Sequence, residues 1–275
     1  MNSSSPSARE HDLDLHDAQR LTQRRHLGGS RRNGSRLSAH PGNVDVHAAS
    51  SARAQPVAVL FDIDGTLIDT GGAGAASWRL AFDELYGIPA DIGQFTDAGM
   101  TDPDVGRQTF VAVVDREPTR QEFARLLERR PYHLRQTVAE SERYRVLPGA
   151  QELLERLLEA GYLLGIVTGN LEAAAHIKLH RARLNRFFSF GGYGSDSSDR
   201  VEVTRLALKR AAWVYGADIA LQEAIVVGNT PHDVQAAHAA GVRCVGVASH
   251  HFSIPRLRDA GADHVIASLK EPLPL

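Results

Sequence analysis

Residues 57–70 read VAVLFDIDGTLIDT, and the fold can be worked out from this stretch. The run 57–61 is short and apolar and is closed by a Gly-Thr turn signal, so it predicts a buried β-strand. Asp62 and Asp64 follow where the strand stops, and they point to the same side if the backbone is still extended there. Two crowded carboxylates repel each other, which raises a pKa or recruits a cation. Because Asp-x-Asp-Gly-Thr also occurs as an ordinary turn, the rest of the chain decides between a turn and a site.

From Pro56 onward, apolar strand patterns alternate with helical patterns. The further strand candidates are 163–169, 224–228, 243–248 and 264–267. The helix candidates 150–161, 203–216 and 233–241 have apolar residues at spacings of three and four. This order predicts an α/β fold, a Rossmann-like doubly wound parallel sheet with helices on both faces. Ligands bind such sheets at the carboxyl ends of the strands, where the polar residues of interest fall.

Residues 72–148 interrupt the alternation. They contain helical patterns at 75–87 and 121–140 and no convincing strand. We therefore expect a helical cap domain over 72–148, inserted into a core domain formed by 56–71 and 149–275. Glycines on one side of the insertion and a Pro-Gly pair at 148–149 on the other are plausible linkers.

Residues 1–55 differ in composition from the rest of the chain. They hold eight arginines, no lysine, five acids, five histidines and no aromatic residue. Such a segment cannot bury enough apolar surface to offset the entropy of ordering, so we expect a disordered N-terminal extension. A start site placed too far upstream would give the same pattern, and a tail that contacts RNA or DNA is the less favoured alternative.

The overall composition excludes several classes of protein. The chain has 31 basic and 33 acidic residues, which gives no global bias toward nucleic acid or membrane partners, and 43% hydrophobic residues, enough for a sizeable core. No apolar run approaches the length of a membrane span. The single cysteine, Cys244, excludes an internal disulfide and is compatible with a reducing compartment, so we expect a cytoplasmic protein. We further expect a monomer or a homodimer.

The polar residues at the strand ends form an ordered series. Along the chain they are Asp62-x-Asp64-Gly65-Thr66, then Thr168-Gly169-Asn170, then a basic residue, then Gly228-Asn229-Thr230-Pro231-His232-Asp233. This series resembles the haloacid dehalogenase superfamily, in its phosphatase branch with a helical C1-type cap inserted after the first strand. The resemblance covers about residues 57–270. It implies a magnesium-dependent (Mg2+) phosphatase for small phosphate esters, such as phosphoglycolate-like or sugar-phosphate compounds.

Asp62 and Asp64 have the chemistry that phosphoryl transfer requires. A carboxylate such as Asp62 can act as the nucleophile and form an aspartyl-phosphate that water later cleaves. Asp64 suits general acid/base work, because it can protonate the leaving alcohol and then deprotonate water. The resemblance implies the same two roles, with a metal contribution from the backbone carbonyl of Asp64. It also favours phosphate ester hydrolysis over carbon–halogen cleavage, because the dehalogenating members lack the second aspartate.

Thr168, Gly169 and Asn170 are the candidates for phosphate binding. Thr168 ends the second predicted strand, and Gly169-Asn170 can open a helix whose free N–H groups point at an anion. A simple helix N-cap is the alternative, which Thr and Asn also serve.

The resemblance further implies a Lys or Arg that holds the transferring phosphate. Arg200 is our choice, since it lies 29 residues before Asn229 at the expected start of a helix, and its fork can grip two phosphate oxygens. Arg205 and Lys209 are the other possibilities, although a solvated helix face explains both more simply.

The last motif departs from the family pattern at Asn229. The family usually has an aspartate there as a direct magnesium ligand, and the resemblance gives Asp62, Asp64, Asn229 and Asp233 as the metal site of this chain. Asparagine offers a neutral oxygen, whereas magnesium favours carboxylates. We therefore expect weakened metal binding, and activity that is weak or needs high magnesium.

Residues 95–104 of the expected cap, FTDAGMTDPD, resemble the loop that such caps present to substrate. Asp97, Thr101 and Asp102 are the candidates for substrate contact there. Ordinary turn and N-cap chemistry is an equal alternative for these side chains.

Two other functions stay open. A phosphomutase would share Asp62 and Asp64 but would return the phosphoryl group to a second hydroxyl. A non-catalytic phosphometabolite-binding or regulatory protein is the other alternative, and Asn229 is the residue that motivates it.

Overall fold

The computed structural model describes residues 57–216, 218–249 and 251–275. The N-terminal extension expected over residues 1–55 lies outside the described residues. None of the helices in the described ranges has the length and the apolar character that a membrane crossing needs.

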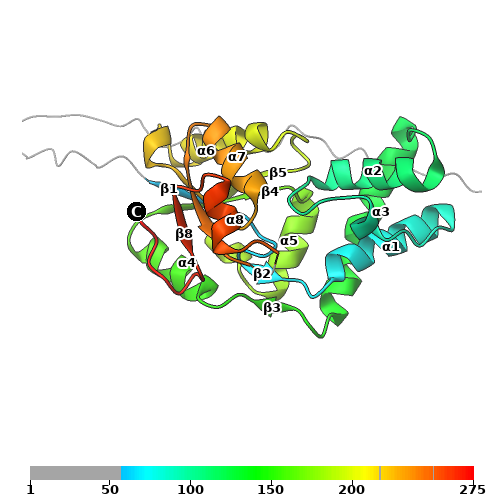
Figure 1. Ribbon diagram of the computed structural model, residues 1–275, viewed down its shortest axis with the longest axis horizontal. Coiled ribbons are helices and arrows are strands. Elements are labelled where there is room, and N and C mark those ends of the chain that lie inside the picture. Colours follow the sequence, from blue (N-terminus) through cyan, green and yellow to red (C-terminus); the bar gives the residue numbers. More distant parts are fainter. Residues whose placement is uncertain (1–56, 217, 250) are drawn as a thin grey trace, which may run out of the picture. The chain divides into compact units, whose positions relative to one another are not determined.

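A six-stranded parallel sheet forms the centre of the fold (Figure 1). Its strands are β1 (Ala58–Phe61), β4 (Leu163–Thr168), β5 (Phe190–Tyr193), β6 (Ile225–Gly228), β7 (Arg243–Val247) and β8 (His264–Ile266). They lie in the order β5–β4–β1–β6–β7–β8, and each neighbouring pair is parallel. The strand order reverses at β1, which places the ligand-binding edge of such a sheet at the carboxyl end of this strand. The predicted α/β fold is confirmed.

Both faces of β1 are buried, which explains its continuous apolar sequence. Val59 and Phe61 belong to one hydrophobic cluster of the core, and Ala58 and Leu60 belong to the other. A strand covered on both faces needs an apolar residue at every position. Asp62 is the first polar residue after this run, and its N–H still donates to a carbonyl of β6 (2.9 Å). This hydrogen bond fixes the backbone of Asp62 at the edge of the sheet and so positions its carboxylate.

Helices cover both faces of the sheet (Figure 1). They are α4 (Ala150–Glu159), α5 (Glu172–Arg181), α6 (Arg200–Tyr215), α7 (Pro231–Ala239) and α8 (Ile254–Asp259), with short 3-10 helices η3 (Asn185–Phe187) and η4 (Leu221–Glu223). Helices α6 and α7 begin slightly earlier than the apolar spacing predicted. The side chains of Asp199 and Thr230 accept hydrogen bonds from the first-turn amides, so N-caps set these starts.

The segment between residues 72 and 144 is helical. It contains α1 (Ala73–Tyr86), η2 (Ile92–Gln94), α2 (Asp102–Val114) and α3 (Arg120–Glu140). Trp78, Phe82, Phe110 and Leu126 share a hydrophobic cluster that is distinct from the clusters of the sheet. The division of the chain into a core and a cap stays a prediction.

Three strands were not predicted. A two-stranded antiparallel ribbon pairs β2 (Ile68–Asp69) with β3 (Arg145–Val146), and β3 falls inside the segment expected to lack strands. Two residues are too few for an alternating pattern to reveal a strand. β5, with the sequence FGGY, was not predicted because its two adjacent glycines interrupt the apolar pattern of a buried strand.

Candidate functional site

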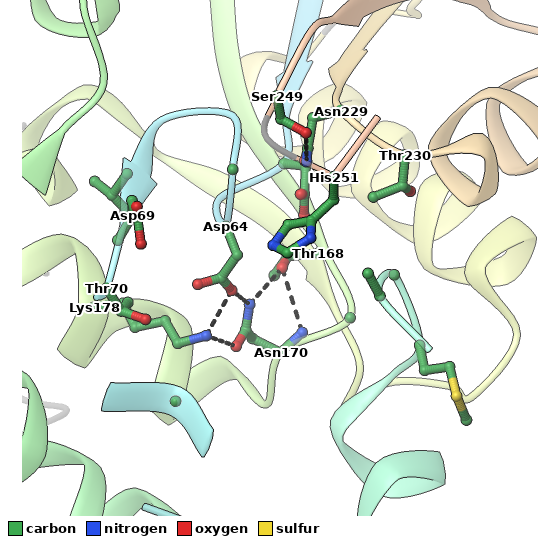
Figure 2. A pocket seen from close by; sticks show the side chains of 18 of the residues that line it. Asp64, Asp69, Thr70, Thr168, Asn170, Lys178, Asn229, Thr230, Ser249 and His251 are labelled. Atoms are coloured by element: carbon green, nitrogen blue, oxygen red, sulfur yellow. Dashed lines mark hydrogen bonds and ion pairs between the residues drawn. The ribbon is translucent and has the colours of Figure 1, made fainter. Parts of the chain in front are cut away.

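The carboxyl ends of β1, β4 and β6 border a cavity of ≈ 1160 Å³ (Figure 2). Most of the predicted site residues line it, namely Asp62, Asp64, Thr168, Gly169, Asn170, Arg200 and Asn229 from the core and Asp97 and Asp102 from the cap. Asp233 and Thr101 lie near this cavity in the fold but do not line it. The structure thus brings together residues from five separate parts of the sequence.

Asp62 is buried, with 6% of its surface exposed. Burial, reinforced by the negative charge of Asp233, raises the pKa of Asp62 to about 8, although the charge of Arg200 opposes the shift. Arg200 Nη2 lies 4.0 Å from Asp62 Oδ1, which is too far for a hydrogen bond. The Asp62 carboxyl is therefore short of positive charge, and its surroundings suit a bound cation.

Asp64 belongs to a tight polar network with Lys178 and Asn170 (Figure 2). Its Oδ2 accepts hydrogen bonds from Lys178 Nζ (2.5 Å) and Asn170 Nδ2 (2.8 Å), and Lys178 also donates to Asn170 Oδ1 (2.6 Å). Burial disfavours the charged form of Asp64, but the charge and hydrogen bond of Lys178 outweigh it and lower the pKa of Asp64. The network holds Asp64 as a carboxylate in this state of the site.

Thr168 and Asn170 shape the loop after β4. Thr168 Oγ1 accepts hydrogen bonds from the backbone N–H (3.3 Å) and from Nδ2 (2.8 Å) of Asn170. Helix α5 begins at Glu172, later than the Gly169-Asn170 start that the sequence suggested. Its first N–H groups, those of Leu171 and Glu172, donate to the side chains of Asp102 (2.8 Å) and Ser195 (3.2 Å). Gly169 is required for the close approach of the cap, because a Cβ there would lie 2.6 Å from the carbonyl oxygen of Met100.

Arg200 lies at the first position of α6 and reaches into the cavity. Its Nη1 donates to the carbonyl of Gly99 (3.2 Å), and Nη2 forms an ion pair with Asp233. Its Nε is buried and has no hydrogen-bond partner in the described part of the chain. An unpaired guanidinium N–H beside the Asp62 carboxyl is the chemistry that a phosphate group satisfies. Arg205 and Lys209 are exposed residues further along the same helix and do not line the cavity.

Asn229 is held from two sides at the end of β6. Its Oδ1 accepts a hydrogen bond from the Thr66 hydroxyl (3.1 Å), and its Nδ2 donates to Ser249 Oγ (3.3 Å). Gly65 makes room for this amide, because it adopts φ +79° and a Cβ there would lie 2.4 Å from Asn229 Nδ2. Asn229 therefore packs directly beneath the turn that carries Asp62 and Asp64.

Asp233 acts as a helix cap in this structure. Its Oδ2 accepts hydrogen bonds from the backbone N–H groups of Asn229 (3.1 Å) and Thr230 (2.9 Å) and from the Thr230 hydroxyl (2.8 Å). Its Oδ1 is paired with Arg200. Asp233 thus fixes the position of the Asn229 backbone and of the Arg200 guanidinium.

The oxygen donors at this edge fit a hard cation. Asp62 and Asn229 line the cavity, although Asn229 Oδ1 accepts from the Thr66 hydroxyl, and the Asp64 carbonyl, expected as a ligand, belongs to the same turn. Within the described ranges, however, no three His, Cys, Asp or Glu side chains are placed as a metal-binding group. Asn229 is an amide and not one of these side-chain types. Asp233 already forms an ion pair with Arg200 and caps the start of α7. The predicted metal ligands stay a prediction.

The three cap candidates have different surroundings. Asp97 is exposed and lines the cavity. Thr101 is buried and caps α2 by accepting from the N–H of Asp104, which favours the N-cap alternative for this residue. Asp102 joins cap and core: its N–H donates to the Gly169 carbonyl (2.7 Å), and its Oδ2 accepts from the N–H of Leu171 (2.8 Å).

Two buried cations in the cavity were not predicted, Lys178 of α5 and Arg130 of α3. Each occupies a core position of an apolar stripe. Lys178 falls among Ala174, Ala175 and Leu179, and Arg130 is spaced by four from Leu126 and Leu134. A charged residue in the buried stripe of a helix is the sequence signal that could have identified both.

Comparisons with known proteins agree on the kind of protein. A family model described as haloacid dehalogenase-like hydrolase matches residues 59–247. The pyrophosphatase PpaX of Bacillus velezensis is 31% identical, over 70% of this chain and 82% of its own length. A phosphoglycolate phosphatase of Pseudomonas savastanoi is 27% identical, over 80% and 79%. A hydrolase from Pseudomonas syringae of known structure is 26% identical, with a TM-score of 0.60 over 78% of this chain and 94% of its own.

Proposed function

This chain belongs to the haloacid dehalogenase-like hydrolase family, and on that premise we propose that it is a magnesium-dependent phosphatase for small phosphate monoesters. One observation carries the proposal. A buried acid with a raised pKa, a second acid held by a lysine, a threonine hydroxyl and an arginine with an unpaired N–H all border one cavity. Phosphoryl transfer needs a nucleophile, a proton donor and charge neutralisation within a few ångströms of each other.

Asp62 is the proposed nucleophile. It stands at the end of β1, where its backbone is fixed by β6, and it attacks phosphorus to form an aspartyl-phosphate while the ester oxygen leaves. Thr168 and Arg200 are proposed to hold the non-bridging oxygens, with Arg200 kept in place by Asp233. Water then cleaves the acyl-phosphate and returns Asp62 as a carboxylate.

Asp64 is the proposed acid and base. Its lowered pKa suits the second half of the reaction, in which a carboxylate takes a proton from the attacking water. The first half needs Asp64 protonated, so that it can donate to the leaving alcohol. A phosphate dianion beside Asp64 raises the pKa of Asp64 by like-charge repulsion, which favours this protonation when substrate is bound.

Asp62, the Asp64 carbonyl and Asn229 are the residues that we propose to hold the magnesium ion. When bound, the ion would supply positive charge that neutralises the phosphate next to the nucleophile. Asp233 supports this site by fixing the backbone of Asn229. With one charged side chain among the direct donors, the affinity for magnesium is expected to be low.

The test is a phosphate-release assay on a panel of phosphate monoesters at increasing magnesium, with Asp62→Asn as the diagnostic variant. Removing the nucleophile is expected to lower the rate by about 1,000-fold or more. Asp83→Asn is the matched control, because Asp83 is an exposed aspartate of α1 that does not line the cavity. Mass spectrometry of the wild-type protein quenched in acid should show a phosphoryl group on Asp62.

The product distinguishes the alternatives. Free phosphate supports the phosphatase, whereas an isomerised phosphate ester without free phosphate would show a mutase. Tight binding of an ester without any turnover at saturating magnesium would show a binding protein and would overturn the proposal.

A further inference from the structure

A second cavity, of ≈ 750 Å³, lies between helices α3 and α5. Among the described residues, it shares no lining residue with the cavity at the strand ends. Helix α3 contributes Arg135, Val138 and Ala139, and helix α5 contributes Ala173, His176, Ile177, His180 and Arg181. These positions recur at spacings of three and four, so each helix presents one face to the cavity. The volume is in the range of about 300–1,000 Å³ that small-molecule sites occupy.

The base of this second cavity is apolar. Val138 is buried and belongs to the hydrophobic cluster that joins α3 to the start of α5. Ile177 packs against that cluster, and Ala139 and Ala173 add small side chains to the walls. Such a base favours a ligand with an apolar body, because burying that body removes apolar area from water.

The charged groups around the apolar base are basic. Arg135, His176, His180 and Arg181 line the cavity, and no aspartate or glutamate of the described ranges does so. Arg135 is exposed, and its guanidinium makes no hydrogen bond or ion pair with any described residue. Its charge and its N–H donors are therefore free to bind an anionic group.

Arg181 is held in a way that leaves part of its guanidinium available. Its Nη1 donates to the carbonyls of Val138, Ala139 (3.2 Å) and Ser141 (2.9 Å) at the end of α3. Its guanidinium carbon lies 4.7 Å from the centre of the Tyr144 ring. Because all three hydrogen bonds use one nitrogen, the donors on Nη2 and Nε can still serve an anion.

A metal site is the alternative, because His176 and His180 have the i,i+4 spacing with which a helix can bind a metal. His176 Nδ1 lies 3.1 Å from Asn185 Oδ1, which leaves Nε2 for a ligand. Glu172 Oε1 is 4.0 Å from Nε2, but Glu172 is exposed and does not line the cavity. No three His, Cys, Asp or Glu side chains form a metal-binding group in the ranges that the structure describes. The two arginines also repel a cation, so an anion fits this cavity better.

The position of the cavity gives a bound ligand an effect on the whole fold. Helix α3 belongs to the inserted helical segment, whereas α5 follows β4 and begins next to the loop of Thr168 and Asn170. A ligand that touches both helices favours the arrangement in which they adjoin, because the cavity exists only there. Such a ligand opposes movement of the inserted segment during turnover.

We propose that the cavity between α3 and α5 is a regulatory site for a small organic anion with an apolar body, such as an aromatic carboxylate. The carboxylate lies between Arg135 and Arg181, and the apolar body lies against Val138 and Ile177. Bound there, the anion holds the inserted segment against the sheet domain and slows turnover. The binding goes beyond the proposed phosphatase function and does not depend on it, whereas the inhibition rests on it.

The experiment is an NMR titration of the full chain with three probes: 2-naphthoate, 2-naphthamide, which has the same shape without the charge, and acetate, which has the charge without the apolar body. We expect 2-naphthoate to shift the amide signals of Val138, Ala139 and Ile177. It should bind at least about tenfold more tightly than either of the other probes. Arg135→Gln should weaken the binding of 2-naphthoate about threefold or more, and should leave that of 2-naphthamide unchanged.

Arg125→Gln is the matched control, because Arg125 is an exposed residue of α3 that does not line the cavity. It should bind 2-naphthoate as the wild type does. Arg181 is left intact, because it also holds the end of α3. Equal affinity for 2-naphthoate and 2-naphthamide, or unchanged affinity in Arg135→Gln, overturns the site. Signals that shift only around Thr168 also overturn it, because the anion then binds in the cavity at the strand ends.

Phosphate release tests the regulation. Saturating 2-naphthoate should lower kcat for the best phosphate ester at least about threefold, and excess ester should not reverse the effect. Arg135→Gln should need more 2-naphthoate for the same inhibition. Binding between α3 and α5 without any change in kcat overturns the regulatory role. A protein that hydrolyses no ester overturns the proposed function, and the NMR titration still decides whether the site exists.

Discussion

At the residue scale, Asn229 is the member of the proposed magnesium site that we expect to limit its affinity. Its amide is held by Thr66 and Ser249, and both hydroxyls can also donate to a carboxylate. Asn229→Asp is therefore expected to fit without rearrangement and to add a negative charge next to Asp62. The half-saturating magnesium concentration should fall about tenfold, because the charge of the ligands sets the affinity for such cations. Calorimetric magnesium titration measures this directly, and the magnesium dependence of phosphate release should follow it.

Without magnesium, the same substitution is expected to lower the melting temperature, since a third acid joins Asp62 and Asp233. Magnesium should then raise the melting temperature of Asn229→Asp more than that of the wild type. Ser249→Ala is a suitable control, because it removes a contact of Asn229 without changing charge. Unchanged magnesium affinity in Asn229→Asp would mean that this position does not bind the metal.

The sequence identified the polar and charged side chains that directly follow a predicted strand. Asp62, Asp64 and Thr168 were predicted in this way, Arg200 was chosen from the family resemblance, and all four line one cavity. Lys178 and Arg130 were missed because they lie inside helices, where a lysine or arginine is usually solvated. Their positions in apolar helix stripes were a local signal of burial, but their contacts in the cavity depend on the packing of α5 and α3 against distant parts of the chain, which local sequence does not encode.

At the element scale, one carboxylate joins the end of β5 to the middle of α6. Asp196 accepts hydrogen bonds from both terminal nitrogens of Arg210 (2.6 and 2.7 Å) and from the N–H of Tyr193 (3.0 Å), and Arg210 also donates to the Gly191 carbonyl (2.7 Å). The hydrogen bonds of Arg210, which outweigh the effect of burial, lower the pKa of Asp196 from 3.8. Since Arg210 is partly exposed, Asp196→Asn is expected to cost only about 1 kcal/mol at pH 7.

This contribution has a definite pH dependence. The pKa of Asp196 is lower in the folded chain than in the unfolded chain. The stabilisation is therefore complete above pH 3.8 and is lost as the pH falls below that value. Urea unfolding between pH 3 and 7 should show the wild type and Asp196→Asn converging at the acid end. The exposed Asp259→Asn should show no such convergence. A constant difference down to pH 3 would contradict the assignment.

Helices and strands with long, regular apolar patterns could be predicted from the sequence, and short ones could not. The strand at 163–168 and the helix at 150–159 carry six and ten residues of regular pattern, and both were anticipated. β2 and β3 depend on pairing with each other across the whole insertion, with Ile68 opposite Val146. No local window contains that information, which is why the ribbon at the base of the insertion was not foreseen.

At the scale of the whole folded region, the proposed cap is tied to the core at the phosphate loop. The N–H of Asp102 donates to Gly169, and its carboxylate accepts from Leu171, so one residue makes two hydrogen bonds across the boundary. Apolar contacts of Ala73, Leu134 and Val138 with Leu171 and Ala174 accompany them. Arg181 and Arg200 also donate across this boundary, to the Ser141 carbonyl (2.9 Å) and the Gly99 carbonyl (3.2 Å), and we propose that the cap opens to admit substrate and closes to exclude water.

Asp102→Ala is therefore expected to loosen the cap without unfolding the core. The variant keeps the backbone N–H bond to Gly169 but loses the acceptor for Leu171, and it leaves Arg130 without its charge partner. Hydrogen exchange of the Leu171 amide should accelerate about tenfold or more, because one buried hydrogen bond contributes about 1–3 kcal/mol. Exchange in β1 and β6 should stay at the wild-type rate, and KM should rise more than kcat falls. Asp102→Asn keeps the acceptor and should exchange at Leu171 at a rate closer to that of the wild type. If Leu171 exchanges equally in all three proteins, the Asp102 carboxylate does not hold the proposed cap, and the other contacts across the boundary do.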